Sequence, residues 1–332
     1  MASEWTTVRA ADFIEFNPRL SIKKGAMATK VAMDKLQPFT KKIPATEQAE
    51  FAGGSKFCNG DTIMARITPC LENGKTAFVD ILADGEVAFG STEFIVMRAR
   101  AGISDPQFVY YLATSPAFRN VAIKSMVGSS GRQRVQQGVL DELELTVPPL
   151  KEQQKIGAIL AMMDQKIALN NKINDNLQQQ AMALYASMFL DNPALESTAG
   201  TLKNIADITM GQSPSGSSYN EDGNGEVFYQ GRAEFGYRFP TRRLYTIEPK
   251  RMAEAGDVLL SVRAPVGDLN VAYERCCIGR GLGAIHSRNG YQSFVLYTMF
   301  ALRPQLDIYN GEGTVFGSIN RSALNDMPID IP

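Results

Sequence analysis

The sequence predicts an α+β protein: two similar mixed α/β domains separated by a long amphipathic (coiled-coil-type) helix. Three observations predict it, namely the length of 332 residues, one uninterrupted helical pattern near the middle, and matching segments on either side of that pattern. At roughly 100–200 residues per domain, the length fits two domains. We therefore place the first domain at residues 1–148, the helix at 149–192 and the second domain at 193–332.

The helical segment begins after Pro148 and Pro149, and Gly157 is its only glycine up to about residue 190. Its apolar residues recur mostly three or four positions apart, which is the spacing of one helix face. About 40 helical residues would extend roughly 60 Å, about twice the width of a small domain, so the apolar stripe needs a partner helix. The positions expected to face that partner are Ile156, Leu160, Met163, Ile167, Ile173, Leu177 and Leu184.

Three segments of the first domain reappear in the second domain in the same order. Residues 60–69 match 256–265, residues 108–111 match 294–297, and residues 140–148 match 324–332. Any one of these matches is modest, but three in one order indicate a duplicated domain whose loops differ in length between the copies.

Both copies contain short β-rich runs bounded by Gly, Asn and Pro turn signals. We expect strands at 62–67, 77–81 and 93–97 in the first copy, and at 258–262 and 269–273 in the second. One helix fits each copy, at about 106–113 and about 291–302.

The composition excludes several classes of protein. With 44% hydrophobic and 21% charged residues, the chain is neither fibrous nor disordered. It has no apolar run of 18 residues and no secretion signal, so we expect a cytoplasmic protein. Cys58, Cys70, Cys276 and Cys277 lack CxxC spacing, which favours reduced thiols over a zinc site or disulfides. The single histidine, His286, excludes catalysis or metal binding by several imidazoles.

Catalytic motifs are also missing from the sequence. It contains neither GxxxxGK[ST], which would cradle a nucleotide phosphate, nor the Asn-Pro-Pro-aromatic motif of amino methylation. The glycine-rich residues 279–283 lack GxGxxG spacing and no helical run follows them, so we interpret them as a turn, with an anion-binding loop as the alternative. We therefore expect a binding protein rather than an enzyme, with no catalytic residue, metal or cofactor of its own.

The formal net charge of −1 conceals a basic stretch, because residues 228–251 hold six basic and two acidic residues with aromatic residues between them. Arginine can grip phosphates or a guanine edge, and glutamine can bind adenine similarly. Aromatic residues at this spacing more often pack under a sheet, and lysines often form an ordinary solvated face. The loops at 128–134 and 211–215 are either phosphate-binding loops or plain turns. The candidate DNA contacts are Lys23, Lys24, Lys41, Lys42, Lys75, Arg132, Arg134, Gln230, Arg232, Arg238, Arg242, Arg243 and Arg263.

Several motifs, taken in order, carry a family resemblance. Residues 148–156 (Pro-Pro-Leu-Lys-Glu-Gln-Gln-Lys-Ile) lead into the long helix, and the other motifs are residues 60–75, 89–94, 211–214 and 256–268. Together they cover nearly the whole chain. On these motifs the chain resembles the DNA specificity (S) subunits of type I restriction-modification systems.

The resemblance implies that each domain is a target recognition domain that reads one half of a split sequence in double-stranded DNA. It implies that long helices set the spacing between the half-sites and dock methyltransferase (M) subunits. It also implies that this chain has no catalytic activity. S-adenosylmethionine is then expected on the methyltransferase, and ATP and Mg are expected on the partner subunits, which include a restriction/translocase (R) subunit.

The sequence departs from the family pattern in one place. In the family a second long helix follows the second domain, whereas this sequence stops at Pro332, the position equivalent to Pro148. We therefore expect the stripe at 156–188 to pair with a second copy of this chain or with a methyltransferase helix. The alternative function is a helix-mediated scaffold, or a truncated specificity subunit, that acts mainly through protein–protein contacts.

Overall fold

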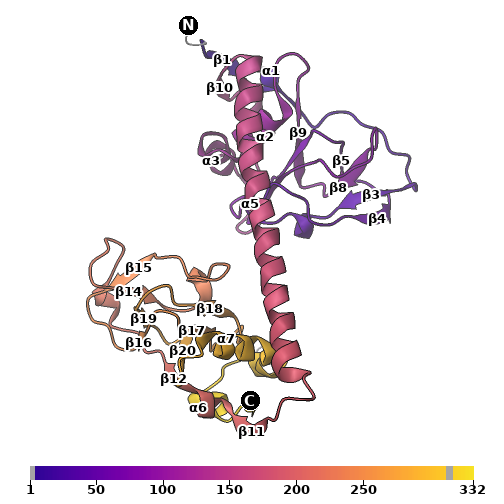
Figure 1. Cartoon of the computed structure of the whole chain (residues 1–332). Coiled ribbons are helices and arrows are strands. Elements are labelled where there is room, and N and C mark those ends of the chain that lie inside the picture. Colours follow the sequence, from indigo (N-terminus) through magenta and orange to yellow (C-terminus); the bar gives the residue numbers. More distant parts are fainter. Residues whose placement is uncertain (1–3, 312–316) are drawn as a thin grey trace. The chain divides into compact units, whose positions relative to one another are not determined.

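The computed structural model describes residues 4–311 and 317–332, and the chain divides into two compact units (Figure 1). Unit 1 is Met1–Lys172 and unit 2 is Ile173–Pro332. The long helix α5 (Leu150–Tyr185) ends in one π-helical turn, Ala186–Leu190, and contributes residues to both units. The long helix expected from the apolar spacing is therefore confirmed.

Unit 1 contains two four-stranded sheets and one two-stranded sheet. The first sheet has the order β2-β9-β6-β7 and is antiparallel, and the second has the order β4-β3-β8-β5 with a parallel β3–β8 pair. The strands are β2 (Ile14–Phe16), β9 (Phe94–Ala99), β6 (Thr62–Ala65), β7 (Thr76–Phe78), β4 (Glu47–Glu50), β3 (Met27–Val31), β8 (Ala88–Gly90), β5 (Ser55–Phe57) and the pair β1 (Thr6–Arg9) and β10 (Glu144–Val147). The helices are α1 (Ala10–Phe13), α2 (Pro106–Thr114), α3 (Pro116–Lys124) and α4 (Gln137–Asp141), with a 3₁₀ turn at Met33–Lys35.

Unit 2 repeats this arrangement. Its antiparallel sheet has the order β12-β20-β17-β18, and its second sheet has the order β13-β15-β14-β19-β16 with a parallel β14–β19 pair. The strands are β12 (Ala206–Met210), β20 (Leu282–Ser287), β17 (Val258–Ser261), β18 (Leu269–Val271), β13 (Tyr219–Asn220), β15 (Leu244–Thr246), β14 (Glu226–Tyr229), β19 (Cys276–Ile278), β16 (Met252–Ala253) and the pair β11 (Thr198–Thr201) and β21 (Pro328–Ile331). The helices are α6 (Leu202–Ile205), α7 (Gln292–Ala301), α8 (Arg303–Asp307) and α9 (Arg321–Asn325), with 3₁₀ turns at Gly216–Ser218, Arg232–Glu234 and Ile308–Asn310.

The strand registers confirm that the two units share one fold. In unit 1, Thr62 of β6 pairs with Met97 of β9. In unit 2, Val258 of β17 pairs with Ile285 of β20, the same place in the equivalent strand pair. The matching segments at 60–69 and 256–265 therefore occupy equivalent strands.

The central strands β6 and β17 are buried along their whole length and are mostly apolar, with Thr62 and Ser261 as the exceptions. Successive side chains of a strand point to opposite faces of the sheet. In unit 1, Met64 joins one hydrophobic core and its neighbour Ile63 joins another. In unit 2, Leu260 and Leu259 divide between two cores in the same way. This double burial explains why these strands read in the sequence as continuous apolar runs.

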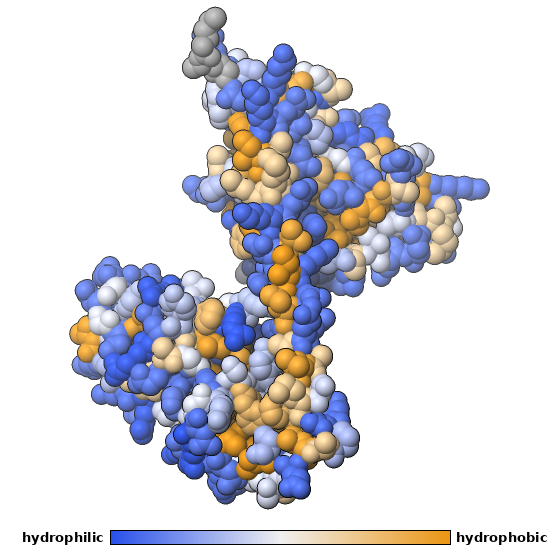
Figure 2. Space-filling model, in the orientation of Figure 1, coloured by the Kyte–Doolittle hydropathy of each residue, from blue (hydrophilic) through white to orange (hydrophobic). Residues whose placement is uncertain are grey.

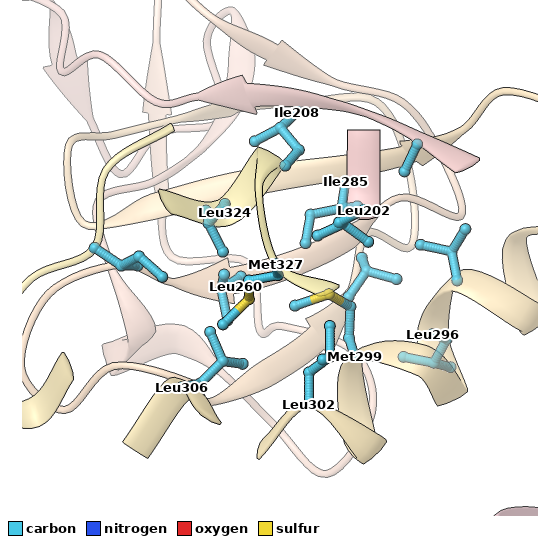
Figure 3. Close-up of a cluster of buried hydrophobic side chains, with 14 of the residues drawn as sticks. Leu202, Ile208, Leu260, Ile285, Leu296, Met299, Leu302, Leu306, Leu324 and Met327 are labelled. Carbon is cyan, nitrogen blue, oxygen red and sulfur yellow. The ribbon is translucent and has the colours of Figure 1, made fainter. Parts of the chain in front are cut away.

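The main core of unit 2 lies between its antiparallel sheet and its helices (Figure 3). Leu260 and Ile285 project from the sheet, and Met299 and Leu324 meet them from α7 and α9. All four side chains are fully buried. Burying a side chain of this size contributes about 1.5–3 kcal/mol relative to leaving it in water, so this cluster is a principal source of the unit's stability.

The five expected strands and two expected helices are present, with small differences at their ends. The strand expected at 77–81 is Thr76–Phe78, and the helix expected at 291–302 is Gln292–Ala301. We did not expect α3, which starts directly after α2. Ser115 has extended backbone angles, and its side chain accepts a hydrogen bond from the Phe118 N–H. It therefore ends α2 and caps a new helix, with Pro116 in the first turn.

Candidate nucleic-acid interface and helical surface

Helix α5 is fixed to unit 1 through the start of α2. Gln153 is buried, and its amide donates to the backbone oxygens of Ile103 and Pro148 and accepts from the Asp105 N–H at 3.0 Å. One turn later, a Cβ at Gly157 would lie 2.8 Å from Oδ1 of Asp105. The glycine therefore allows α5 to lie directly against the residue that caps α2.

A half-buried lysine strengthens this attachment further along α5. Nζ of Lys41 donates to Gln107 and to the hydroxyl of Tyr111, and it lies 4.5 Å from the centroid of the Tyr111 ring. The Tyr111 hydroxyl in turn donates to Asp164 of α5 at 2.6 Å. Burial lowers the pKa of Lys41, and burial together with the bond to Asp164 raises the pKa of Tyr111. In this position Lys41 anchors the helix.

In unit 2, the end of α5 packs against α7, the helix equivalent to α2. The hydroxyl of Tyr185 lies 2.9 Å from that of Thr298, and the Tyr185 ring contacts Phe294 and Tyr297. Phe189 in the π-helical turn adds a T-shaped contact with Phe294. Each unit thus receives its part of α5 on the same helix of the repeated fold.

Between these attachments the apolar stripe is exposed, and Figure 2 shows hydrophobic atoms at the surface along α5. Of the predicted partner-facing residues, Ile156 packs against the core of unit 1 and Leu160 is half-buried. The other five are 47–60% exposed: Met163, Ile167, Ile173, Leu177 and Leu184. Monomeric proteins rarely expose a contiguous apolar surface of this kind, so the stripe is suited to a protein partner.

The candidate lysines of unit 1 fall into two groups. Lys23, Lys24 and Lys42 are exposed, and no hydrogen bond or ion pair of their side chains is found among the described residues. Lys41 and Lys75 are half-buried, and Nζ of Lys75 donates to the backbone oxygen of Met33 at 3.0 Å. The side chains of the first group therefore lie in solvent, whereas those of the second are bonded within unit 1.

In the loop at 128–134, Arg132 is exposed whereas Arg134 is paired with Glu93. The two closest contacts between Arg134 and the Glu93 carboxylate measure 2.7 and 3.0 Å. This hydrogen bonding lowers the pKa of Glu93. Arg134 therefore already has an anionic partner within the chain.

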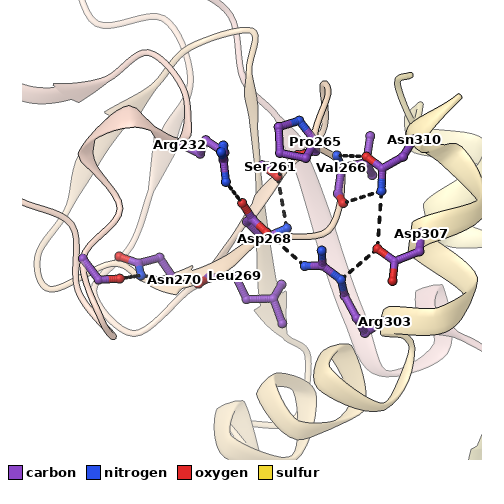
Figure 4. Close-up of polar contacts among 11 residues, drawn as sticks. Arg232, Ser261, Pro265, Val266, Asp268, Leu269, Asn270, Arg303, Asp307 and Asn310 are labelled. Atoms are coloured by element: carbon purple, nitrogen blue, oxygen red, sulfur yellow. Dashed lines mark hydrogen bonds and ion pairs between the residues drawn. The ribbon is translucent and has the colours of Figure 1, made fainter. Parts of the chain in front are cut away.

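The basic stretch of unit 2 is partly neutralised by acidic residues from elsewhere in the unit. Arg232 pairs with Asp268, which also accepts a hydrogen bond from Arg303 (Figure 4). Two further arginines are paired as follows: Arg242 with Glu274 at 2.5 Å, and Arg243 with the buried Glu234. Exposed ion pairs are worth about 0–1 kcal/mol, which applies to Arg242, whereas the partner of Arg243 is buried. Arg238 is exposed, and its side chain makes no ion pair with a described residue.

Gln230 lies in a polar hollow of about 650 Å³ whose lining includes Ser213, Tyr219 and Arg280. Its amide nitrogen donates to Ser213 Oγ at 3.0 Å, and its amide oxygen accepts from the Tyr219 hydroxyl at 3.3 Å. An adjoining hollow of about 700 Å³ contains Arg263 and shares Arg280 with the first.

Two arginines at these hollows, Arg280 and Arg321, were not among the residues expected from the sequence. Arg280 lies in the glycine-rich segment 279–283, of which residues 279–281 form the turn between β19 and β20 and the last two begin β20. The position of Arg280 between two glycines is the sequence feature that could have identified it as a candidate, because exposed glycine-rich loops place side chains in solvent. Arg321 gave no signal in the sequence.

The single histidine of the chain contacts a buried aspartate. Nδ1 of His286 lies 2.5 Å from Oδ1 of the buried Asp257. At the equivalent place in unit 1, Arg98 makes two bonds of 2.7 Å to the buried Asp61. The histidine thus replaces an arginine in a repeated ion-pair position, which gives it a structural role.

The described part of the chain contains no cluster of metal-binding side chains, and all four cysteines in it are free thiols. Burial raises the pKa of the Cys276 thiol to about 12, which disfavours the reactive thiolate. Among the same residues, no helix combines the length and apolar character needed to cross a membrane.

Comparison with known proteins identifies the family. The family model for the type I restriction modification DNA specificity domain matches residues 2–179. The putative type I restriction enzyme MjaX specificity subunit of Methanocaldococcus jannaschii is 30% identical over 292 residues, which are 82% of this chain and 68% of that protein. The EcoAI specificity subunit of Escherichia coli is 27% identical over 212 residues, or 62% of this chain, and the match spans one third (33%) of that subunit.

A solved structure supports the fold. The crystal structure of the type I restriction-modification system S subunit from M. genitalium aligns with 99% of this chain and 85% of its own, with a TM-score of 0.57 and 13% sequence identity. At that identity the likeness concerns the fold alone. The family model and the MjaX relative establish the family, and the chain belongs to the DNA specificity subunits of type I restriction-modification systems, a class of non-catalytic subunit.

Proposed function

We propose that this specificity subunit directs a cytoplasmic methyltransferase and restriction complex to a split DNA sequence, with each unit reading one half-site. The observation that carries this proposal is the repeated fold. Two copies of one domain on a single chain are suited to two separate stretches of duplex. The exposed Lys23, Lys24 and Lys42 in unit 1, and the arginines of 228–251 in unit 2, supply the positive charge that phosphates attract.

We also propose that the exposed stripe on α5 docks the methyltransferase subunits. The stripe offers several large apolar side chains, such as Ile167 and Leu177, without the covering that a folded monomer normally provides. The partner subunits would supply S-adenosylmethionine, ATP and Mg, and the described residues form no cluster of side chains that could hold a metal ion.

The function is tested by expressing this chain with the methyltransferase subunit encoded beside it in a host that lacks other adenine methylation. Sequencing should then map methylated adenines within one motif that has two specified halves and an unspecified gap. Methylation at a continuous motif would contradict the assignment of one half-site to each unit, and the absence of methylation would favour the scaffold alternative.

The docking surface is tested separately with Leu177→Glu. Because Leu177 is 56% exposed, the substitution should leave the free energy of unfolding within about 0.5 kcal/mol of wild type. It should nevertheless abolish co-purification with the methyltransferase, because a buried carboxylate at the interface would lack a partner. Gln179→Glu is the matched control, since residue 179 is exposed and two positions along a helix face different directions. Equal loss in both variants would contradict the stripe.

Size-exclusion chromatography with light scattering on the chain alone gives the third measurement. A dimer that Leu177→Glu dissociates would show that a second copy covers the stripe when the methyltransferase is absent. A monomer would leave the methyltransferase as the proposed occupant.

A further inference from the structure

Six segments of unit 2 line one surface, here termed the Arg280 cleft. It comprises the two adjoining hollows that share Arg280, and their linings come from 210–219, 230, 243–244, 262–264, 280 and 317–321. The topology brings these segments together. Strands β14 and β19 are parallel, so their carboxyl ends lie at one edge of the sheet, and β12 ends opposite the start of β20.

The loops of the cleft lie in close contact with one another. A Cβ at Gly211 would lie 2.1 Å from the backbone oxygen of Gly279, and one at Gly281 would lie 2.9 Å from that of Gln230. Ser213 Oγ accepts from both the Gln230 amide and the Arg280 N–H. The side chains at the cleft therefore project from closely packed loops.

Among the residues that the structure describes, the linings of the cleft contain arginines and no acidic residue, so their charge is positive. Arg263, Arg280 and Arg321 are exposed, and their side chains make no ion pair or hydrogen bond with described residues. The neighbouring hollow at Arg232 differs in this respect, because Asp268 lies between Arg232 and Arg303 there (Figure 4). A fourth arginine of the lining, Arg243, pairs with the buried Glu234. The Arg280 cleft thus holds three arginines that lack anionic partners among the described residues, beside one that is already paired.

The side-chain amide of Gln230 is held in the cleft by hydrogen bonds that leave part of its bonding capacity unused. Its amide nitrogen donates one of its two hydrogens to Ser213. Its amide oxygen lies 3.3 Å from the Tyr219 hydroxyl, whose single hydrogen is shared with the backbone oxygen of Pro214 at 3.1 Å. One hydrogen and one lone pair remain. An adenine in the major groove offers N7 as an acceptor and N6 as a donor, which matches that remaining pair.

We propose that the Arg280 cleft is the DNA-reading surface of unit 2, in which Arg263, Arg280 and Arg321 contact phosphates and Gln230 reads an adenine edge. This inference rests on the proposed function and specifies its site. It shifts the main contacts away from Arg232 and Arg242, whose charges are met within the chain.

The test measures binding of the chain, co-purified with its methyltransferase subunit, to duplexes that carry the mapped motif and to mixed-sequence duplexes. Arg280→Ala and Arg321→Ala should each weaken binding to both by about fivefold or more, and each should reduce the slope of log K against log salt by about one. Arg288→Ala is the matched control, because Arg288 is exposed in the same unit but pairs with Asp207 outside the cleft. It should change affinity by less than about twofold.

Gln230→Ala should have a different effect, namely loss of preference for adenine at one position of one half-site with little change on mixed-sequence DNA. Circular dichroism and melting of each variant show that it is folded, and Arg263→Ala provides a further variant should Arg321→Ala not fold. If the wild-type complex binds no duplex, both the proposed function and the cleft are overturned. If it binds and the cleft variants match Arg288→Ala, the cleft assignment alone is wrong.

Discussion

Two buried aspartates at equivalent positions have different partner side chains in the two units. Asp61 is 1% exposed and receives two bonds from Arg98, whereas Asp257 is 4% exposed and contacts His286, whose side chain is 56% exposed. Each carboxylate also accepts one backbone N–H, from Cys58 and Glu254 respectively. The repeated fold thus keeps the aspartate and its backbone bond while changing the residue that faces it.

We predict that Arg98→Ala destabilises the protein more than His286→Ala does. Removing Arg98 leaves a buried carboxylate without two charged hydrogen bonds, which costs about 2–3 kcal/mol. Water can replace the exposed imidazole of His286, so its loss should cost about 1 kcal/mol. Urea denaturation followed by circular dichroism checks both values, and His286→Arg should recover the loss. A larger loss for His286→Ala than for Arg98→Ala would contradict the equivalence of the two positions.

At the residue level, the sequence predicts which types of side chain occur at the candidate site. It predicts less well which other residues of the chain those side chains bond to. Gln230 and Arg263, two of the candidate DNA contacts, lie at the Arg280 cleft. The pairing of Arg242 with Glu274 depends on two loops that only the fold brings together. Arg280 could not be singled out in the same way, because the parallel pairing of β14 and β19, which places it beside Gln230, has no local signature.

At the level of elements, the attachment of α5 to α2 depends on one missing side chain. Helices normally gain about 1 kcal/mol when glycine is replaced by alanine. At position 157 the new Cβ would lie 2.9 Å from Cβ of Gln107 and 2.8 Å from Oδ1 of Asp105, the atom that caps α2 by accepting the Phe108 N–H. The close contact therefore opposes the usual gain.

We predict that Gly157→Ala lowers the free energy of unfolding by about 1 kcal/mol or more, because overpacking costs about 1–3 kcal/mol and exceeds the helix gain. Gly138→Ala in α4 is the control, since a Cβ added at Gly138 would meet nothing within 4 Å and the φ of this glycine is not positive. That substitution should stabilise the protein by up to about 1 kcal/mol. Chemical denaturation of both variants measures the difference, and a stabilising Gly157→Ala would show that α5 is not held at this contact.

The burial of an element determines whether the sequence predicts it. The continuous apolar runs of β6 and β17 are recognisable because both of their faces are covered. Strand β3 (Met-Ala-Thr-Lys-Val) is only five residues long and has only Thr29 and Val31 buried, so it lacks a continuous apolar run. Helix α3 is not predicted because Ser115 and Pro116 indicate the end of α2. The same two residues also begin a new helix.

At the scale of the whole molecule, duplication was the most informative sequence feature because it constrains many elements at once. The three matched segments fall in equivalent places: the strands β6 and β17, the helices α2 and α7, and the segments at α4–β10 and α9–β21. Their order fixes the topology of both copies even though the second sheets gave no reliable signal. Each copy also has its own hydrophobic cores, so each has its own source of stability.

We predict from these separate cores that one unit can be destabilised without the other. Met64 and Leu260 occupy equivalent positions in β6 and β17, and both are fully buried. Met64→Ala and Leu260→Ala should each cost about 2–5 kcal/mol because each leaves a cavity. Hydrogen exchange read by mass spectrometry should show loss of protection in peptides of 4–147 for Met64→Ala, and in peptides of 198–311 and 317–332 for Leu260→Ala. Equal loss across both units in either variant would mean that the chain unfolds as one cooperative body, because a defect in one core can spread only if the units depend on each other for stability.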